Sequence, residues 1–280
     1  MNLYKKILFS MIKNSKYSIM LVLISMSGIM ILISLINSYK TVDTSIKRYL
    51  DEYLNPDAII QINPTNKESL EVLNDIQGIE KISTRMVVDA TIRKYDGSLI
   101  TGRFFTKNNK DIPKMDILSS SEENNEISDI EVSFCSKFLQ RNGYNVGDTI
   151  TILTPTGEKE AIIKHVVSSP ESMMITRNSF AFMDSKDFGY VYLDYENFSK
   201  IFNYYDTYNQ ILLKFSENSG HQKILDEVTE KLQPIGVLSA KIYEGSDIQE
   251  GVNGTLKAIK MLAVSLPIIF FLVTLIFIFI

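Results

Sequence analysis

The sequence predicts an α+β membrane protein in which two transmembrane helices flank one large domain. Three observations predict this class. Two charge-free apolar segments, 19–36 and 261–280, lie near the two ends. All 33 Asp and Glu residues lie between them, from Asp43 to Glu250. Within that interval, short β-rich runs alternate with segments of helical periodicity.

The first apolar segment predicts a transmembrane helix over residues 17–39. Tyr17 and Tyr39 flank it, as aromatic rings do at a membrane interface. The alternative is a secretory signal peptide, with Lys5 and Lys6 as its basic start. Its apolar part exceeds the roughly 7–15 residues of a signal peptide and no A-x-A-like site follows, so we expect a membrane span.

Charge predicts the orientation. Residues 1–16 carry four lysines and no acid, which places the N-terminus in the cytoplasm by the positive-inside rule. The interval 43–250 holds 22 Lys and Arg residues against 33 acids, a net charge of −11 outside the membrane. Such a surface is a poor partner for nucleic acid. Residues 1–16 are also amphipathic, so they predict either an interfacial helix on membrane lipid or a plain basic flank.

Both spans are expected to continue as amphipathic stalk helices. Val42, Ile46 and Leu50 follow the first span at helical spacing, and Val252 and Leu256 precede the second. Helices that run into the bilayer suit a protein that transmits motion across it, and the same pattern is expected of a plain stalk.

The two ends of the intervening region predict a split ferredoxin-like subdomain. Strand 57–63, helix 67–79 and a hairpin turning at Asp96-Gly97 form one half. Strand 209–215, a helix stopped by Pro234 and Gly236, and strand 237–243 form the other. We therefore expect one α+β subdomain interrupted by an insertion.

The insertion predicts a mainly β subdomain. It begins with a polar loop, continues with a helix capped by Ser133 and Gly143, and then forms a hairpin across Pro155 to Gly157. A strand at 189–195 and a short helix follow. The predicted division of the chain is cytoplasmic helix 1–16, span 17–39, stalk 40–56, split subdomain 57–105 and 209–243, insertion 106–208, stalk 244–260 and truncated span 261–280.

Several runs, taken in order, resemble the extracytoplasmic region of the FtsX/MacB-like ABC transporter permease superfamily. They are DIQGIEKIS (75–83), FLQRN (138–142), VGDTI (146–150) and VVSSP (166–170). The resemblance implies a porter-type outer domain and a non-enzymatic, mechanical role in efflux, extrusion or signalling. It also implies that the chain is the N-terminal part of a longer multi-pass protein, rather than a protein with a C-terminal tail anchor.

The resemblance further implies the partners. Members of this family pair as homo- or heterodimers and recruit a cytoplasmic ABC ATPase subunit, which binds the ATP. The chain itself carries no G-x-x-x-x-G-K-[ST] phosphate-binding loop, so no cofactor of its own is expected. An extracytoplasmic accessory protein is a further expected partner, and the bacterial cell membrane is the expected location.

Two clusters are candidate substrate or partner contacts. Aromatic side chains gather in 190–208, where they predict either a binding face or sheet packing. Residues 168–183 predict an adaptable apolar loop or part of the core. The candidates are Met173, Met174, Phe180, Phe182, Tyr190, Tyr192 and Tyr205.

Other site chemistry is not indicated. His165 and His221 lack neighbouring ligands at metal-site spacing, Cys135 is the only cysteine, and no G-x-S-x-G elbow occurs. We therefore expect no catalytic, cofactor-binding or metal-binding residues. The alternative function is the sensor domain of a two-span membrane receptor, and a third is a membrane-anchored binding or adhesion protein.

Overall fold

The computed structural model describes residues 15–107, 110–121, 130–173, 176–178, 181–182, 186–216, 220–243 and 247–279. They divide into two compact units. The helical unit comprises Met1–Arg48 and Val252–Ile280, and the globular unit comprises Tyr49–Gly251. Each unit is considered by itself below.

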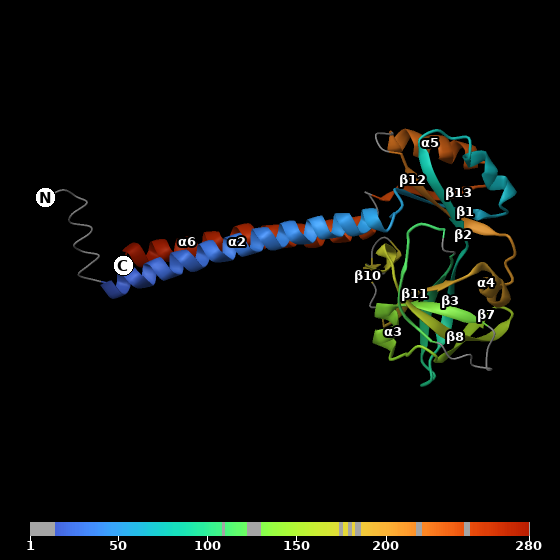
Figure 1. Ribbon diagram of the computed structural model, residues 1–280, viewed down its shortest axis with the longest axis horizontal. Helices are drawn as coiled ribbons and strands as arrows, with labels where there is room; N and C mark the ends of the chain where they lie inside the picture. Colours follow the sequence, from blue (N-terminus) through green and yellow to red (C-terminus); the bar gives the residue numbers. More distant parts are fainter. Residues whose placement is uncertain are drawn as a thin grey trace. The chain divides into compact units, whose positions relative to one another are not determined.

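Two long helices make up the helical unit. α2 (Ser15–Glu52) contains the first apolar segment and α6 (Asp247–Phe279) contains most of the second. They run alongside each other in Figure 1, and a Cβ atom added at Gly28 would lie 3.3 Å from the Cβ of Phe270. Both are long and apolar enough to cross a membrane, and few of their side chains are buried. An apolar surface of this extent suits lipid or further helices better than water.

A four-stranded sheet forms one half of the globular unit. Its strands are β1 (Ala58–Thr65), β2 (Ile79–Arg85), β12 (Tyr208–Phe215) and β13 (Val237–Ile242), in the order β13-β1-β12-β2. Every neighbouring pair is antiparallel. The 3₁₀ helix η1 (Glu68–Leu73) joins β1 to β2, and α5 (His221–Leu232) joins β12 to β13.

The helices close one face of this sheet. α5 buries residues at helical spacing, including Ile224 and Val228, and η1 buries Leu70 and Leu73. These side chains share one core with β1 and β12, and Figure 1 shows α5 lying across the strands. The apolar residues that recur at helical spacing in 220–232 thus form the buried face of α5.

A closed sheet forms the other half. It contains β3 (Val87–Arg93), β4 (Leu99–Thr106), β5 (Asp116–Ser120), β6 (Glu131–Cys135), β7 (Thr149–Thr154), β8 (Gly157–Ser168) and β11 (Phe188–Leu193). The order is β5-β8-β6-β11-β4-β3-β7, and β7 also pairs with β8. This last pairing closes the ring from β8 to β7 into a barrel, to which β5 is added on β8.

Aromatic side chains fill the core of this barrel. Phe104, Phe134, Phe138 and Phe188 are fully buried there. α3 (Ser136–Asn142) and α4 (Tyr195–Phe202) supply further core residues, and Asp194 caps α4 by accepting from the Asn197 backbone N–H. The remaining elements are the 3₁₀ helix η2 (Pro170–Met173) and the paired strands β9 (Thr176–Asn178) and β10 (Ala181–Phe182).

Several local predictions are confirmed. The turn between β3 and β4 contains Asp96 and Gly97, the latter with φ +81°. β7 and β8 pair up to Thr154 opposite Gly157, and Gly143 ends α3 in the left-handed conformation. These elements depend on glycine and turn chemistry that is local in sequence.

Other local expectations differ from the structure. The helix expected over 67–79 is only the short 3₁₀ helix η1, and Ser133 lies inside β6 rather than at a helix N-cap. The polar segment expected to be a loop contains β5. In each case pairing or packing with distant residues decides the conformation.

The hairpin β3–β4 belongs to the barrel rather than to the subdomain expected over 57–105 and 209–243. β3 pairs with β7, and β4 pairs with β11 in parallel. Its inward side chains, Ile92, Ile100 and Phe104, therefore join the barrel core. The chain changes sheets between Arg85 and Val87, about 20 residues earlier than the sequence suggested.

Candidate functional site

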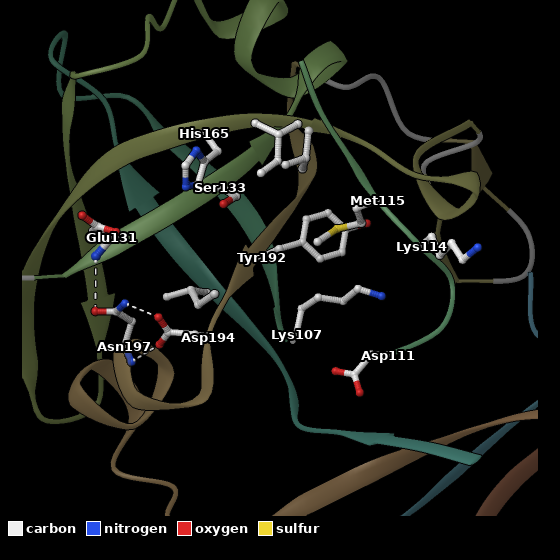
Figure 2. Close-up of a pocket in the computed structure, with 13 residues that line it drawn as sticks. Lys107, Asp111, Lys114, Met115, Glu131, Ser133, His165, Tyr192, Asp194 and Asn197 are labelled. Atoms are coloured by element: carbon white, nitrogen blue, oxygen red, sulfur yellow. Dashed lines mark hydrogen bonds between the residues drawn. The ribbon is translucent and has the colours of Figure 1, made fainter. Parts of the chain in front are cut away.

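A pocket of about 460 Å³ opens on the barrel side of the globular unit (Figure 2). One wall comes from Lys107 and the segment 110–117, which contributes Asp111, Lys114, Met115 and Ile117. The opposite side comes from β6, β8, β11 and the start of α4. Its volume is in the range of small-molecule sites, about 300–1,000 Å³.

Three strands position the pocket floor. Ser133 on β6 lies directly opposite His165 on the parallel strand β8 and opposite Tyr192 on the antiparallel strand β11. Cross-strand partners project from the same face of a sheet. His165, Ser133 and Tyr192 therefore form a row across the floor, with His165 and Ser133 at one end (Figure 2).

The carboxylates around the pocket already have protein partners. Glu131 pairs with Lys164 at 3.3 Å. Asp194 accepts from the backbone N–H of Asn197 at 2.7 Å and from its side-chain amide at 2.8 Å. Asp111 also makes an interaction in the structure. The acidic groups are thus largely committed to holding the walls.

The hydrogen-bond donors that line the pocket have more unused bonding capacity than its carboxylates. Lys107 donates from Nζ to the carbonyl of Pro113, which uses one of its three protons. No ion pair of Lys114 and no side-chain hydrogen bond of Ser133 occurs among the described residues. The buried Nδ1 atom of His165 has no hydrogen-bond partner within the same part of the chain.

Burial changes the titration of Lys107. It lowers the pKa of this amine from the ordinary 10.5 to about 8, and Arg85 adds to the effect, whereas Glu171 and Asp111 oppose it. The amine is therefore poorly hydrated beside a cavity, which strengthens its interaction with any anion that enters.

A buried ion pair lies beside the pocket and joins the two sheets. Arg85, at the end of β2, donates to both carboxylate oxygens of Glu171 on η2 at 2.9 and 2.5 Å. Its Nε atom donates to Gln210 on β12 at 2.7 Å, and the guanidinium lies 4.3 Å from the ring centroid of Phe105. Both charged side chains are less than one-tenth exposed.

The residues predicted from sequence are distributed over several places. Tyr190 and Tyr192 are buried in β11, and of these only Tyr192 lines the pocket. Tyr205 is 69 % exposed in the connection from α4 to β12. Met173 ends η2 and Phe182 lies in β10. Met174 and Phe180 lie outside the described residues. Their role in binding stays a prediction.

Sequence reasoning missed Lys107, Ser133 and His165 as one cluster. The sequence pattern tests His165 only for metal binding and for hydrolase catalysis, and it predicts Ser133 at a helix start. A signal existed in the alternation of β6 and β8, but it does not identify which strands become neighbours. Within the described residues, no group of three or more His, Cys, Asp or Glu side chains could hold a metal ion.

No protein-family model matches the chain, and no curated protein matches it. The solved structures that are similar to it include the following three. The extracellular domain of the noncanonic ABC-type transporter YknZ from Gram-positive bacteria has 11 % identity and a TM-score of 0.40, covering 67 % of this chain and 99 % of that one.

The periplasmic region of MacB from Actinobacillus actinomycetemcomitans has 10 % identity and a TM-score of 0.42, covering 76 % and 98 %. A domain of an inferred permease protein from Porphyromonas gingivalis has 11 % identity and a TM-score of 0.37, covering 64 % and 77 %. Because the sequence identities and TM-scores are this low, the function proposed below depends on this chain's own residues and topology. These three solved structures are an extracellular domain and a periplasmic region of transporters and a permease domain.

Proposed function

We propose that this chain is the membrane subunit, or permease, of an ABC transporter and that it couples a cytoplasmic ATPase to movement of the globular unit outside the membrane. One observation carries the proposal. α2 extends for 38 residues and α6 for 33, and each contains an apolar span together with its stalk in one uninterrupted helix. A continuous helix transmits displacement because its backbone hydrogen bonds resist bending, most fully in α2, whereas Pro267 inside α6 removes one of these bonds.

Residues 50–55, at and just after the end of α2, belong to the globular unit and are held there by several hydrogen bonds. Asn55 N–H donates to the carbonyl of Leu50 at 2.9 Å, and Lys114 N–H donates to the carbonyl of Tyr53 at 2.8 Å. The Tyr53 hydroxyl also bonds to Asp116. Displacement of this helix end would therefore reach the segment 110–117 directly.

A second attachment reaches the four-stranded sheet. Asp57 pairs with Lys214 at 2.9 Å and accepts from the backbone N–H of Phe215 at 2.8 Å. The strand order β13-β1-β12-β2, with a helix in each crossover, supports a split ferredoxin-like subdomain. In this proposal the sheet is the rigid body that the stalk moves.

The proposal includes partners and location. The chain pairs with a second permease as a homo- or heterodimer, and an ABC ATPase subunit binds the ATP. The lysine-rich N-terminus lies in the cytoplasm, next to membrane lipid, and the acidic globular unit lies outside the bacterial cell membrane. The chain performs no catalysis itself, and an accessory protein outside the membrane completes the pathway.

Two labelling sites test orientation and coupling in a Cys135→Ala background. Leu99→Cys is exposed on the globular unit, and Lys16→Cys lies at the start of α2. In intact cells, a membrane-impermeant maleimide should label Leu99→Cys and should label Lys16→Cys only after lysis. The reverse pattern would overturn the orientation.

Coupling is then measured on the complex purified from the native host in lipid nanodiscs. Spin labels at Leu99→Cys and Lys40→Cys report the distance from the globular unit to the outer end of the span. ATP with vanadate should shift that distance. An unchanged distance in a complex that hydrolyses ATP would contradict mechanical coupling, and purification with a kinase in place of an ATPase would support the two-span receptor.

A further inference from the structure

We propose that the pocket of Figure 2 binds a small anionic amphiphile, with its oxyanion head beside Lys107 and Lys114 and its short hydrocarbon chain along Tyr192 and Met115. This inference goes beyond the transport role and does not require it. It follows from the pocket's size, from its uncommitted hydrogen-bond donors and from the position of its apolar wall.

The head-group end is determined by the two lysines. In Figure 2 both amines lie on the same side of Met115 and of the ring of Tyr192, the side away from His165 and Ser133. Lys107 retains two donor protons beyond its bond to Pro113. Lys114 makes no ion pair among the described residues. A carboxylate or phosphate satisfies such donors, whereas an ammonium group does not.

The carboxylates of the pocket do not favour a cationic ligand, because they are paired or lie beside Lys107. Glu131 is paired with Lys164, and both oxygens of Asp194 accept from Asn197. Asp111 is the carboxylate that lies near Lys107 in Figure 2 and competes with a ligand for its charge. Its removal should therefore strengthen the binding of an anion.

The apolar wall accommodates a short chain. Met115, Ile117, Val167 and Leu193 line the pocket together with the ring of Tyr192. Ser133 and the unpartnered Nδ1 of His165 lie at the far end of the floor. The hydrocarbon part is therefore bounded by a polar end and cannot be long.

The experiment uses the full chain in phosphatidylcholine nanodiscs, with empty nanodiscs subtracted. Octanoate and octyl phosphate probe the two head groups, octylamine and octanol are the charge controls, and acetate tests the need for the chain. Binding is followed by NMR of ¹³C-labelled histidine, because the chain has only two histidines. Octanoate or octyl phosphate should shift His165 saturably and leave His221 unchanged.

The variants separate the contributions. Lys107→Met and Lys114→Met should each weaken binding about 10- to 100-fold, the size expected for a hydrogen bond to a charged group. Asp111→Asn should tighten it. The matched control Lys241→Met, on β13 in the other sheet, should leave it unchanged.

Several results would overturn the proposal. They are a non-saturable shift of His165, equal affinity in all lysine variants, or equal binding of octylamine. If Lys107→Met fails to fold by circular dichroism, Lys114→Met alone decides, because its amine makes no ion pair that the described fold requires. The transport role would be unaffected, since it is tested by the nucleotide-dependent distance.

Discussion

Arg85 and Glu171 show how much a single pair of residues can contribute at the junction of two sheets. Both side chains are buried, and the guanidinium is also held by Gln210 and Phe105. Removing one partner would leave an uncompensated buried charge. The pair therefore keeps the four-stranded sheet and the barrel in one arrangement.

Glu171→Gln should lower the free energy of unfolding by about 3–5 kcal/mol, because Arg85 stays charged and buried. Glu158→Gln is the matched control. Glu158 forms the same two-bond contact with Arg93, at 2.9 and 2.7 Å, but both side chains are exposed. Its loss should cost at most about 1 kcal/mol.

Both values are measured by urea unfolding of the full chain in nanodiscs, followed by tyrosine fluorescence. Similar costs for the buried and the exposed substitution would show that the junction is not held by this pair.

Lys107 predicts a pH dependence of stability. Its pKa is about 8 in the folded chain and 10.5 ordinarily, so the unfolded chain binds more protons between these values. Stability then rises with pH from 8 towards 10, by at most about 3 kcal/mol at 1.36 kcal/mol per unit. The charged groups that act on the Lys107 amine are Arg85, Glu171, Asp111 and Lys81.

Lys107→Met should remove this slope, so the unfolding free energy of the parent should rise relative to that of the variant as pH rises from 8 to 10. Buried tyrosines such as Tyr192, whose pKa burial raises, titrate equally in both proteins and cancel. A difference that stays constant with pH would show that the amine is hydrated in the folded chain.

At the scale of elements, the packing of α3 on β11 requires a glycine, which has no side chain, at position 189 of β11. A Cβ atom at Gly189 would overlap the ring of Phe138 and lie 2.6 Å from its Cβ. Phe138 can therefore lie flat on the strand and fill the barrel core with Phe134.

Gly189→Ala should lower the free energy of unfolding by about 1–3 kcal/mol through overpacking. Phe138→Ala removes Cγ and the ring, the atoms that the added Cβ would overlap most, so the same glycine substitution should cost less in that background. Urea unfolding of the four proteins in this double-mutant cycle gives the coupling. An equal cost in both backgrounds would place the strain elsewhere.

Elements that depend on local chemistry were predictable, and those that depend on distant partners were not. Gly143 and the Asp96-Gly97 turn follow from residues that tolerate positive φ. β5 could not be predicted, since its five residues are polar or exposed and acquire strand geometry only by pairing with β8. The short η1 likewise reflects the space available over the sheet.

At the scale of the whole chain, charge and apolar surface are separated into the two units. The acids lie between Asp43 and Glu250, whereas most of the apolar side chains of α2 and α6 are exposed. The pocket belongs entirely to the globular unit, and its wall 110–117 bonds through the Lys114 backbone N–H to the carbonyl of Tyr53 in the same unit.

The sequence alone determined the two apolar helices, the acidic interval between them and most of the strands and helices, because each depends on a hydrophobic or turn pattern within a few residues. Only the tertiary structure decided which strands are neighbours. It brought Ser133 beside His165 and Tyr192, and it joined Arg85 to Glu171 across 86 residues. Pairing register and ion pairing depend on contacts between distant segments, and no local periodicity encodes them.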